Sequence, residues 1–172
     1  MLPYCNYCKT KVKEKIMIKI AFVCHGNICR SPMAEFVFKK MISERGIAHN
    51  FHVESLATSD EEIWQGVGNP IHQGTLGIFK KYNIPYDTNK RAVQLTSGDY
   101  DRYDLFIGMD RANVRNMNYI LGTDAEKKIK LLLDYTGKCQ EVADPWYTGN
   151  FEVTYTDIER GCEALLESLG VK

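Results

Sequence analysis

The sequence lacks an excess of charge of either sign, because 22 lysine and arginine residues match 22 aspartate and glutamate residues. Proteins that hold nucleic acid or a membrane surface through bulk electrostatics usually carry a basic excess. The sequence also lacks any apolar run approaching the roughly 20 residues that span a bilayer. These absences predict no nucleic-acid partner and no membrane partner, so any selectivity for anions must come from a local site.

Cysteine is sparse, with six residues in a chain of 172. They are too few and too unevenly placed for a disulfide scaffold, and no secretory apolar segment follows the basic N-terminal stretch. Cys5 and Cys8 have the spacing of half a zinc site, but the other cysteines supply no second closely spaced pair. We therefore expect a cytoplasmic protein that uses neither a metal nor another cofactor.

The length of 172 residues fits one domain with a proper core. Residues 1–16 are rich in lysine and polar groups. We expect them to form an N-terminal extension that is disordered or non-native, and residues 17–172 to form a single domain.

Residues 18–33 organise the rest of the chain. They begin with a near-continuous apolar segment, which is typical of a strand buried on both faces of a parallel sheet. A short loop follows, and Pro32 then suits the first position of a helix. Because a strand, a tight loop and a helix start expose backbone N–H groups, this stretch predicts a phosphate-binding loop after the first strand.

The residue types within this loop suit covalent phosphate chemistry. Cys24 would lie at the positive end of the helix beside Arg30, a setting that favours the nucleophilic thiolate. Arg30 can bind two oxygens of a transferring phosphoryl group, which lysine cannot do. Gly26 permits close backbone approach, and Asn27 tolerates a left-handed conformation. The Ser31 hydroxyl can stabilise the thiolate when it departs.

The rest of the chain alternates strands with helices, which predicts a doubly wound α/β sheet. On the first helix we expect Glu35 on the polar face, and on the second we expect the Lys80 stem to point inward. Asp110 suits the N-cap of the third helix. The expected elements are a helix from Pro32 to Gly46, a strand over 51–56, a loop over 57–68, a helix over 73–83, a strand over 104–109, a helix over 112–121, a strand over 128–133, an aperiodic segment over 134–150 and a last helix ending at Gly170.

Asp144 follows the fourth expected strand and precedes Pro145, which would stiffen the chain beside it. A carboxylic acid at this place could protonate a phenolate leaving group, a contribution of about 10² to 10⁴ in rate. Trp146 and Tyr147 are candidates for flat walls that grip an aromatic ring. Trp64 either joins this rim or packs on its own loop.

Two motifs resemble the low-molecular-weight protein tyrosine phosphatases: residues 24–32, Cys-His-Gly-Asn-Ile-Cys-Arg-Ser-Pro, and residues 144–147, Asp-Pro-Trp-Tyr. The resemblance extends over about residues 18–169 and implies a four-stranded parallel sheet with helices on both faces. It implies hydrolysis of phosphotyrosine in proteins through a cysteinyl-phosphate, with phosphate and other oxyanions as competitive ligands. The implied catalytic residues are Cys24, Arg30 and Asp144, and the implied substrate-binding residues are His25, Gly26, Asn27, Ile28, Cys29, Ser31, Trp64, Trp146 and Tyr147.

Some positions support or depart from the family pattern. Ser55 matches a family serine that helps to fix the loop asparagine. A histidine that often precedes the third strand is replaced near Asn89 and Lys90, so support of the loop is expected to differ. His72 and Gly74 are also atypical at the start of the second helix.

Three other functions fit the sequence less well. An arsenate reductase on the same fold would need resolving cysteines, and none lies between Cys29 and Cys139. A protein-arginine phosphatase tends to have a small hydroxyl residue where this chain has Ile28, so Ile28 favours tyrosine. A phosphotyrosine-binding module would need neither Cys24 nor Asp144.

Cys29 has two possible roles. It is a small buried residue behind the loop, or it forms a disulfide with an oxidised Cys24 and so protects the nucleophile from irreversible oxidation. The family resemblance implies the second role.

Overall fold

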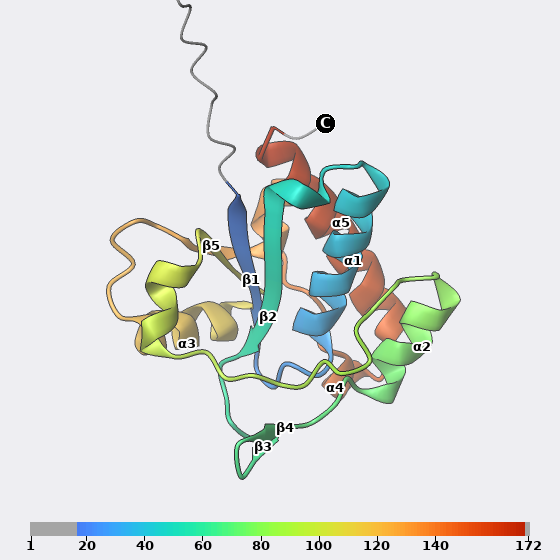
Figure 1. Ribbon diagram of the computed structural model, residues 1–172, viewed down its shortest axis with the longest axis horizontal. Coiled ribbons are helices and arrows are strands. Elements are labelled where there is room, and N and C mark those ends of the chain that lie inside the picture. Colours follow the sequence, from blue (N-terminus) through green and yellow to red (C-terminus); the bar gives the residue numbers. More distant parts are fainter. Residues whose placement is uncertain (1–16, 171–172) are drawn as a thin grey trace, which may run out of the picture.

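The computed structural model describes residues 17–170, and the expected extension over 1–16 lies outside them (Figure 1). Within the described residues, four parallel strands form the main sheet in the order β2-β1-β5-β6. The prediction of a four-stranded parallel α/β sheet is confirmed. The strands are β1 (Ile18–Cys24), β2 (Phe51–Ala57), β5 (Leu105–Gly108) and β6 (Ile129–Leu131).

Strand β1 is apolar because both of its faces are covered. Its side chains alternate between two cores, with Ile20 and Phe22 in one and Ala21 and Val23 in the other. Figure 1 shows α1 and α5 on one face of the sheet and α3 on the other. The helices are α1 (Arg30–Glu44), α2 (Gln73–Lys81), α3 (Arg111–Leu121), α4 (Pro145–Thr148) and α5 (Phe151–Ser168), with 3₁₀ turns η1 (Ala48–Asn50), η2 (Ser97–Arg102) and η3 (Leu132–Thr136).

Helix starts follow the sequence signals closely. Helix α1 begins at Arg30, so Pro32 lies in its first turn rather than at its first position. Asp110 caps α3 as predicted, since its Oδ1 accepts a hydrogen bond of 2.7 Å from the backbone N–H of Asn113. No helix within residues 17–170 is long and apolar enough to cross a membrane.

The prediction of a loop over 57–68 was wrong in part, because this segment contains a small antiparallel hairpin. Its strands are β3 (Ile63–Trp64) and β4 (Val67–Gly68). The turn residues Gln65 and Gly66 have φ of 49° and 80°, as a tight two-residue hairpin requires. Strands of two residues are too short to show an alternation of apolar and polar residues in the sequence.

The expected strand over 128–133 ends early, because the chain turns into η3 after Leu131. Two predicted side-chain orientations were also wrong. Glu35 is only 3% exposed because Ser55 on β2 and Lys90 contact its carboxylate. Lys80 is exposed, and the buried residues of α2 include Thr75 instead.

Two glycines inside helices predict opposite effects of one substitution. A Cβ at Gly161 in α5 would lie 2.6 Å from Cγ of the fully buried Leu132, whereas a Cβ at Gly77 in α2 would meet nothing within 4 Å. We expect Gly161→Ala to lower the free energy of unfolding by about 1–3 kcal/mol through overpacking. Gly77→Ala should raise it by roughly 0.5–1 kcal/mol through helix propensity.

Urea unfolding followed by circular dichroism measures both effects. Equal effects of the two variants would contradict the close packing of α5 on η3.

Candidate active site

The loop between β1 and α1 curls around the thiol of Cys24. Asn27 adopts the left-handed conformation that its residue type tolerates, with φ of 57°. Its backbone N–H donates to Cys24 Sγ at 3.3 Å. The Ser31 hydroxyl lies 3.0 Å from the same sulfur. The sulfur is thus surrounded by hydrogen-bonding groups at the start of a helix, a setting that stabilises negative charge.

Arg30 is almost wholly buried and is held by two carboxylates. Its Nη1 donates to Oδ2 of Asp110 at 2.6 Å, and its Nη2 lies 2.7 Å from Oδ2 of Asp144. Burial lowers the pKa of Arg30, but the charges of Cys24, Asp110 and Asp144 outweigh burial and hold the pKa above its usual value. Arg30 is therefore a permanent cation with a fixed orientation.

Asp110 was expected only as a helix cap, yet it serves the site as well. One carboxylate oxygen caps α3 and the other binds Arg30. Asp110 follows β5, a neighbour of β1 in the sheet. Since carboxyl ends of parallel strands meet at one edge, this position in the sequence was a usable signal.

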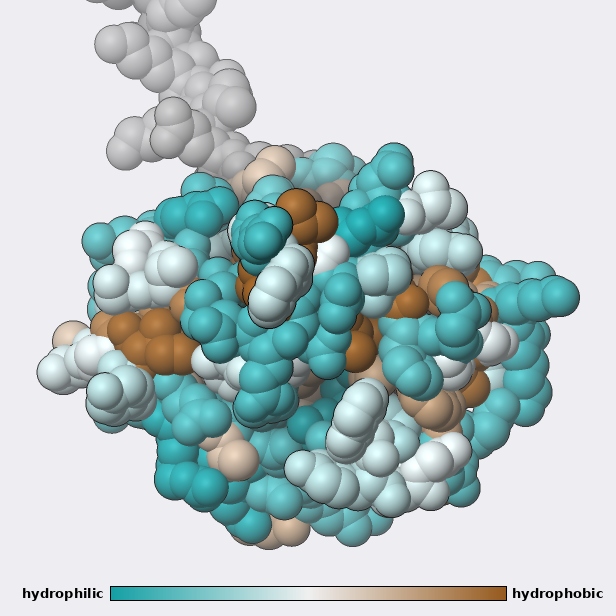
Figure 2. All heavy atoms as spheres, turned by 90° about the horizontal axis from the view of Figure 1, so that it is seen from below, coloured by the Kyte–Doolittle hydropathy of each residue, from teal (hydrophilic) through white to brown (hydrophobic). Residues whose placement is uncertain are grey.

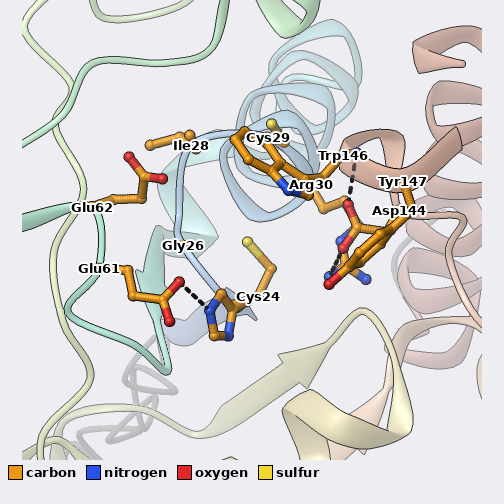
Figure 3. A pocket seen from close by; sticks show the side chains of 11 residues that line it. Cys24, Gly26, Ile28, Cys29, Arg30, Glu61, Glu62, Asp144, Trp146 and Tyr147 are labelled. Carbon is orange, nitrogen blue, oxygen red and sulfur yellow. Dashed lines mark hydrogen bonds and ion pairs between the residues drawn. The ribbon is translucent and has the colours of Figure 1, made fainter. Parts of the chain in front are cut away.

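A pocket opens over Cys24 (Figure 3). Figure 3 shows Asp144, Trp146 and Tyr147 on one side of the pocket and Glu61 and Glu62 on the other. Glu61 and Glu62 were not identified as site residues from the sequence. The lining residues are Cys24, His25, Gly26, Ile28, Cys29, Arg30, Glu61, Glu62, Asp144, Trp146 and Tyr147.

The other sequence-predicted site residues lie elsewhere. Asn27 and Ser31 are buried behind the loop rather than in the pocket. Trp64 is on the hairpin strand β3, is 77% exposed and does not line the pocket. The structure thus brings together the loop, Asp144 and the aromatic pair, and leaves Trp64 outside.

Asn27 is tied to the protein body by its side chain. Its Nδ2 donates to Ser31 Oγ and to Ser55 Oγ, each at 2.8 Å, and its Oδ1 accepts from the backbone N–H of Val93 at 3.0 Å. Ser55 in turn donates to Oε2 of Glu35 at 2.6 Å. Each polar group in this buried series of hydrogen bonds has a partner. The network therefore fixes Asn27 in its left-handed conformation.

Lys90 lies at the place where this sequence departs from the histidine of the family pattern. Its ammonium group makes the last contacts of the hydrogen-bonded series that begins at Asn27. Its Nζ lies 3.3 Å from Oε2 of Glu35 and donates to the backbone oxygen of Ser55 at 2.9 Å. Lys39 contacts the other carboxylate oxygen of Glu35. The side chain of Lys90 is 14% exposed, against 40% for Lys39, so Lys90 is the more closely enclosed partner of the buried Glu35 carboxylate.

Cys29 lines the pocket but differs chemically from Cys24. Burial, with the nearby charges of Cys24 and Asp144, raises the pKa of the Cys29 thiol to about 12. Cys29 therefore stays protonated at neutral pH. His25 also lines the pocket, and its Nε2 lies 2.9 Å from Oε2 of Glu61.

The structure is thus an α/β protein in which a buried thiol and a paired guanidinium, at the start of a helix, line one pocket. A sequence model described as low molecular weight phosphotyrosine protein phosphatase matches residues 19–172. The low molecular weight protein-tyrosine-phosphatase YfkJ of Bacillus subtilis is 39% identical over 155 residues, which cover 89% of this chain and 96% of that protein. The chain belongs to the low-molecular-weight phosphotyrosine protein phosphatase family.

Solved structures agree with this assignment. The crystal structure of YfkJ has a TM-score of 0.81 at 38% identity and covers 90% of this chain and 95% of its own. SP-PTP, a low molecular weight protein tyrosine phosphatase from Streptococcus pyogenes, is 44% identical, with a TM-score of 0.77 and coverage of 89% and 93%. A Drosophila arginine phosphatase is 26% identical, with a TM-score of 0.78 and coverage of 88% and 98%.

The support behind the loop yields a prediction for Lys90. Lys90→Gln removes the charge that balances Glu35 at its enclosed side, which should loosen Ser55 and Asn27. We expect turnover of an aryl phosphate to fall by about tenfold. Losses of about this size are typical when a residue that orients a metal-binding side chain through a hydrogen bond is substituted.

Lys39→Gln is the matched variant, since it removes an equal charge from the exposed side of Glu35 and should cost much less. Steady-state kinetics and unfolding midpoints of both variants provide the measurement. Similar losses in turnover from the two substitutions would show that Lys90 has no special role.

Proposed function

We propose that this protein hydrolyses phosphotyrosine in proteins, and other aryl phosphates, through a cysteinyl-phosphate intermediate. The observation that carries the proposal is the meeting of Cys24, Arg30 and Asp144 in one pocket. The nucleophile and the anion-binding group come from the one loop between β1 and α1, and the acid comes from the distant segment before α4.

The substrate phosphate would displace a carboxylate before reaction. Nη2 of Arg30 is bound to Asp144 in this structure, and the same N–H group suits a phosphoryl oxygen. A phosphate dianion taking this position frees Asp144 to turn toward the leaving oxygen. Asp110 meanwhile keeps its contact with Nη1 and holds the plane of the guanidinium.

In the first step, the thiolate of Cys24 attacks phosphorus as the bond from phosphorus to the tyrosine oxygen breaks. Protonated Asp144 gives its proton to that oxygen, so that the phenol rather than the phenolate departs. Arg30 and the backbone N–H groups of the loop stabilise the charge on the transferring phosphoryl oxygens.

In the second step, water attacks the cysteinyl-phosphate and gives a proton to the Asp144 carboxylate. The sulfur–phosphorus bond breaks and inorganic phosphate forms. The departing thiolate receives the N–H of Asn27 and the hydroxyl of Ser31, which lie 3.3 and 3.0 Å from the sulfur. Inorganic phosphate and other oxyanions should therefore bind the same loop as competitive ligands.

The aromatic residues support an aryl substrate. Trp146 and Tyr147 line the pocket and are 66% and 85% exposed, so their faces are open to a ligand ring. Ile28 adds an apolar contact at the loop. Ile28 also stands where a protein-arginine phosphatase, the alternative on this fold, tends to have a small hydroxyl residue, so it favours phosphotyrosine over phosphoarginine.

Turnover of para-nitrophenyl phosphate tests the proposal directly, and a binding module would show none. Cys24→Ser should abolish that turnover while retaining phosphate binding, because a hydroxyl is a poor nucleophile at neutral pH. Activity above a trace in this variant would overturn the covalent mechanism. Isothermal titration with inorganic phosphate checks that the loop remains folded.

Asp144→Asn separates the acid from the nucleophile. Phenyl phosphates with poor leaving groups should slow by about 10² or more, and those with good leaving groups far less, because only the former need protonation. Measured kcat across a series of substituted phenyl phosphates gives the comparison. Equal losses throughout the series would remove Asp144 from the role of acid.

The pairing of Cys24 with Cys29 under mild oxidation stays a prediction. The two thiols line one pocket. Because the Cys29 thiol is protonated, it would have to lose its proton as it attacks a sulfenic acid on Cys24, with water as the leaving product.

A further inference from the structure

The wall of the pocket opposite Asp144 is acidic. Glu61 and Glu62 immediately precede β3 and line the pocket together with Cys24 and Arg30. Figure 3 shows both carboxylates on the far side of Cys24 from Tyr147 and Asp144. A phosphotyrosine whose phosphate reaches Cys24 would therefore place neighbouring parts of its protein near this wall.

Glu62 is held in place by the hairpin. Its Oε2 accepts a hydrogen bond of 2.6 Å from Nδ2 of Asn69, and its backbone oxygen accepts one of 2.8 Å from the Asn69 N–H. A Cβ at Gly26 would lie 2.9 Å from Cγ of Glu62. The glycine of the phosphate loop thus makes room for the Glu62 side chain, and the carboxylate lies directly beside the catalytic loop.

Glu61 is oriented from two sides. Its backbone N–H donates to Ser59 Oγ at 3.1 Å, and its Oε2 lies 2.9 Å from Nε2 of His25. His25 offsets its charge only when protonated. The side chain of Glu61 remains 71% exposed, so it is accessible to a substrate.

The charges of the pocket do not balance at this wall. Among the described residues that line the pocket, Arg30 is the only lysine or arginine. Arg30 is already matched by Asp110 and Asp144, and during reaction it would serve the phosphate. Glu61 and Glu62 are left without an arginine or lysine partner within the pocket.

We infer that Glu61 and Glu62 determine specificity, selecting phosphotyrosine flanked by lysine or arginine over phosphotyrosine flanked by acidic residues. This inference rests on the proposed function. Charges at the rim of a binding site mainly change association rates, and like charges exclude wrong partners. The preference for one peptide over the other should therefore appear as a difference in kcat/KM. It should weaken at high salt, because salt screens the charges of Glu61 and Glu62.

Two phosphotyrosine peptides that differ only at the flanking positions, lysine in one and glutamate in the other, test the inference. The ratio of their kcat/KM values should favour the lysine peptide by about tenfold or more at low salt. The doubly substituted E61Q/E62Q protein should bring this ratio to within about twofold of one, since it removes the opposing charges. Glutamine keeps the oxygen that Asn69 contacts.

A matched control is E44Q/E126Q, which changes the net charge equally. Glu44 ends α1 and Glu126 precedes β6, so both lie away from the carboxyl ends of the strands. This control should retain the preference of the natural protein. The ratio compares two substrates on one enzyme preparation, so a general loss of activity cancels.

Two results would overturn the inference. One is a natural protein that hydrolyses para-nitrophenyl phosphate but treats both peptides alike. The other is a control protein whose ratio falls as far as that of E61Q/E62Q. Failure to hydrolyse either peptide or para-nitrophenyl phosphate would instead contradict the proposed function.

Discussion

The pair of carboxylates around Arg30 is the interaction on which the site depends. A buried guanidinium is costly unless it is paired and hydrogen-bonded, and Asp110 and Asp144 provide both. These contacts join the phosphate loop, the start of α3 and the segment before α4, which are distant in sequence. Electrostatic compensation of one cation therefore holds the pocket together, and under the proposed function the same cation would bind the substrate phosphate.

The two sides of the pocket would have different tasks under the proposed function. Asp144 and the aromatic pair Trp146 and Tyr147 stand on one side, where the proposal places protonation of the leaving group and binding of the substrate ring. Glu61 and Glu62 stand on the other, carried by a small hairpin at the edge of the site (Figure 3). Figure 2 shows this end of the molecule as a mainly hydrophilic surface with scattered apolar groups, which suits recognition by charge.

Much of the fold could be predicted from local sequence patterns such as apolar runs and helix caps, because burial and backbone hydrogen bonding require these residue types at these places. Strand β1 must be apolar since two cores cover it, and Asp110 caps α3 through its own side chain. The hairpin β3–β4 and the position at which β6 ends were not predicted from the sequence. Both are short, and the backbone there follows tertiary packing rather than an alternation that a few residues can display.

The sequence by itself determined the phosphate loop, because Cys24, Asn27 and Arg30 act through spacing and backbone conformation within one short stretch. It also pointed to Asp144, since that residue follows a strand whose carboxyl end reaches the same edge of the sheet. Only the tertiary structure decided that Glu35 is a buried, balanced carboxylate rather than a surface charge, and that acidic side chains rather than Trp64 line the pocket. Helical periodicity cannot report which neighbour will cover a polar side chain, because that depends on contacts between segments far apart in the chain.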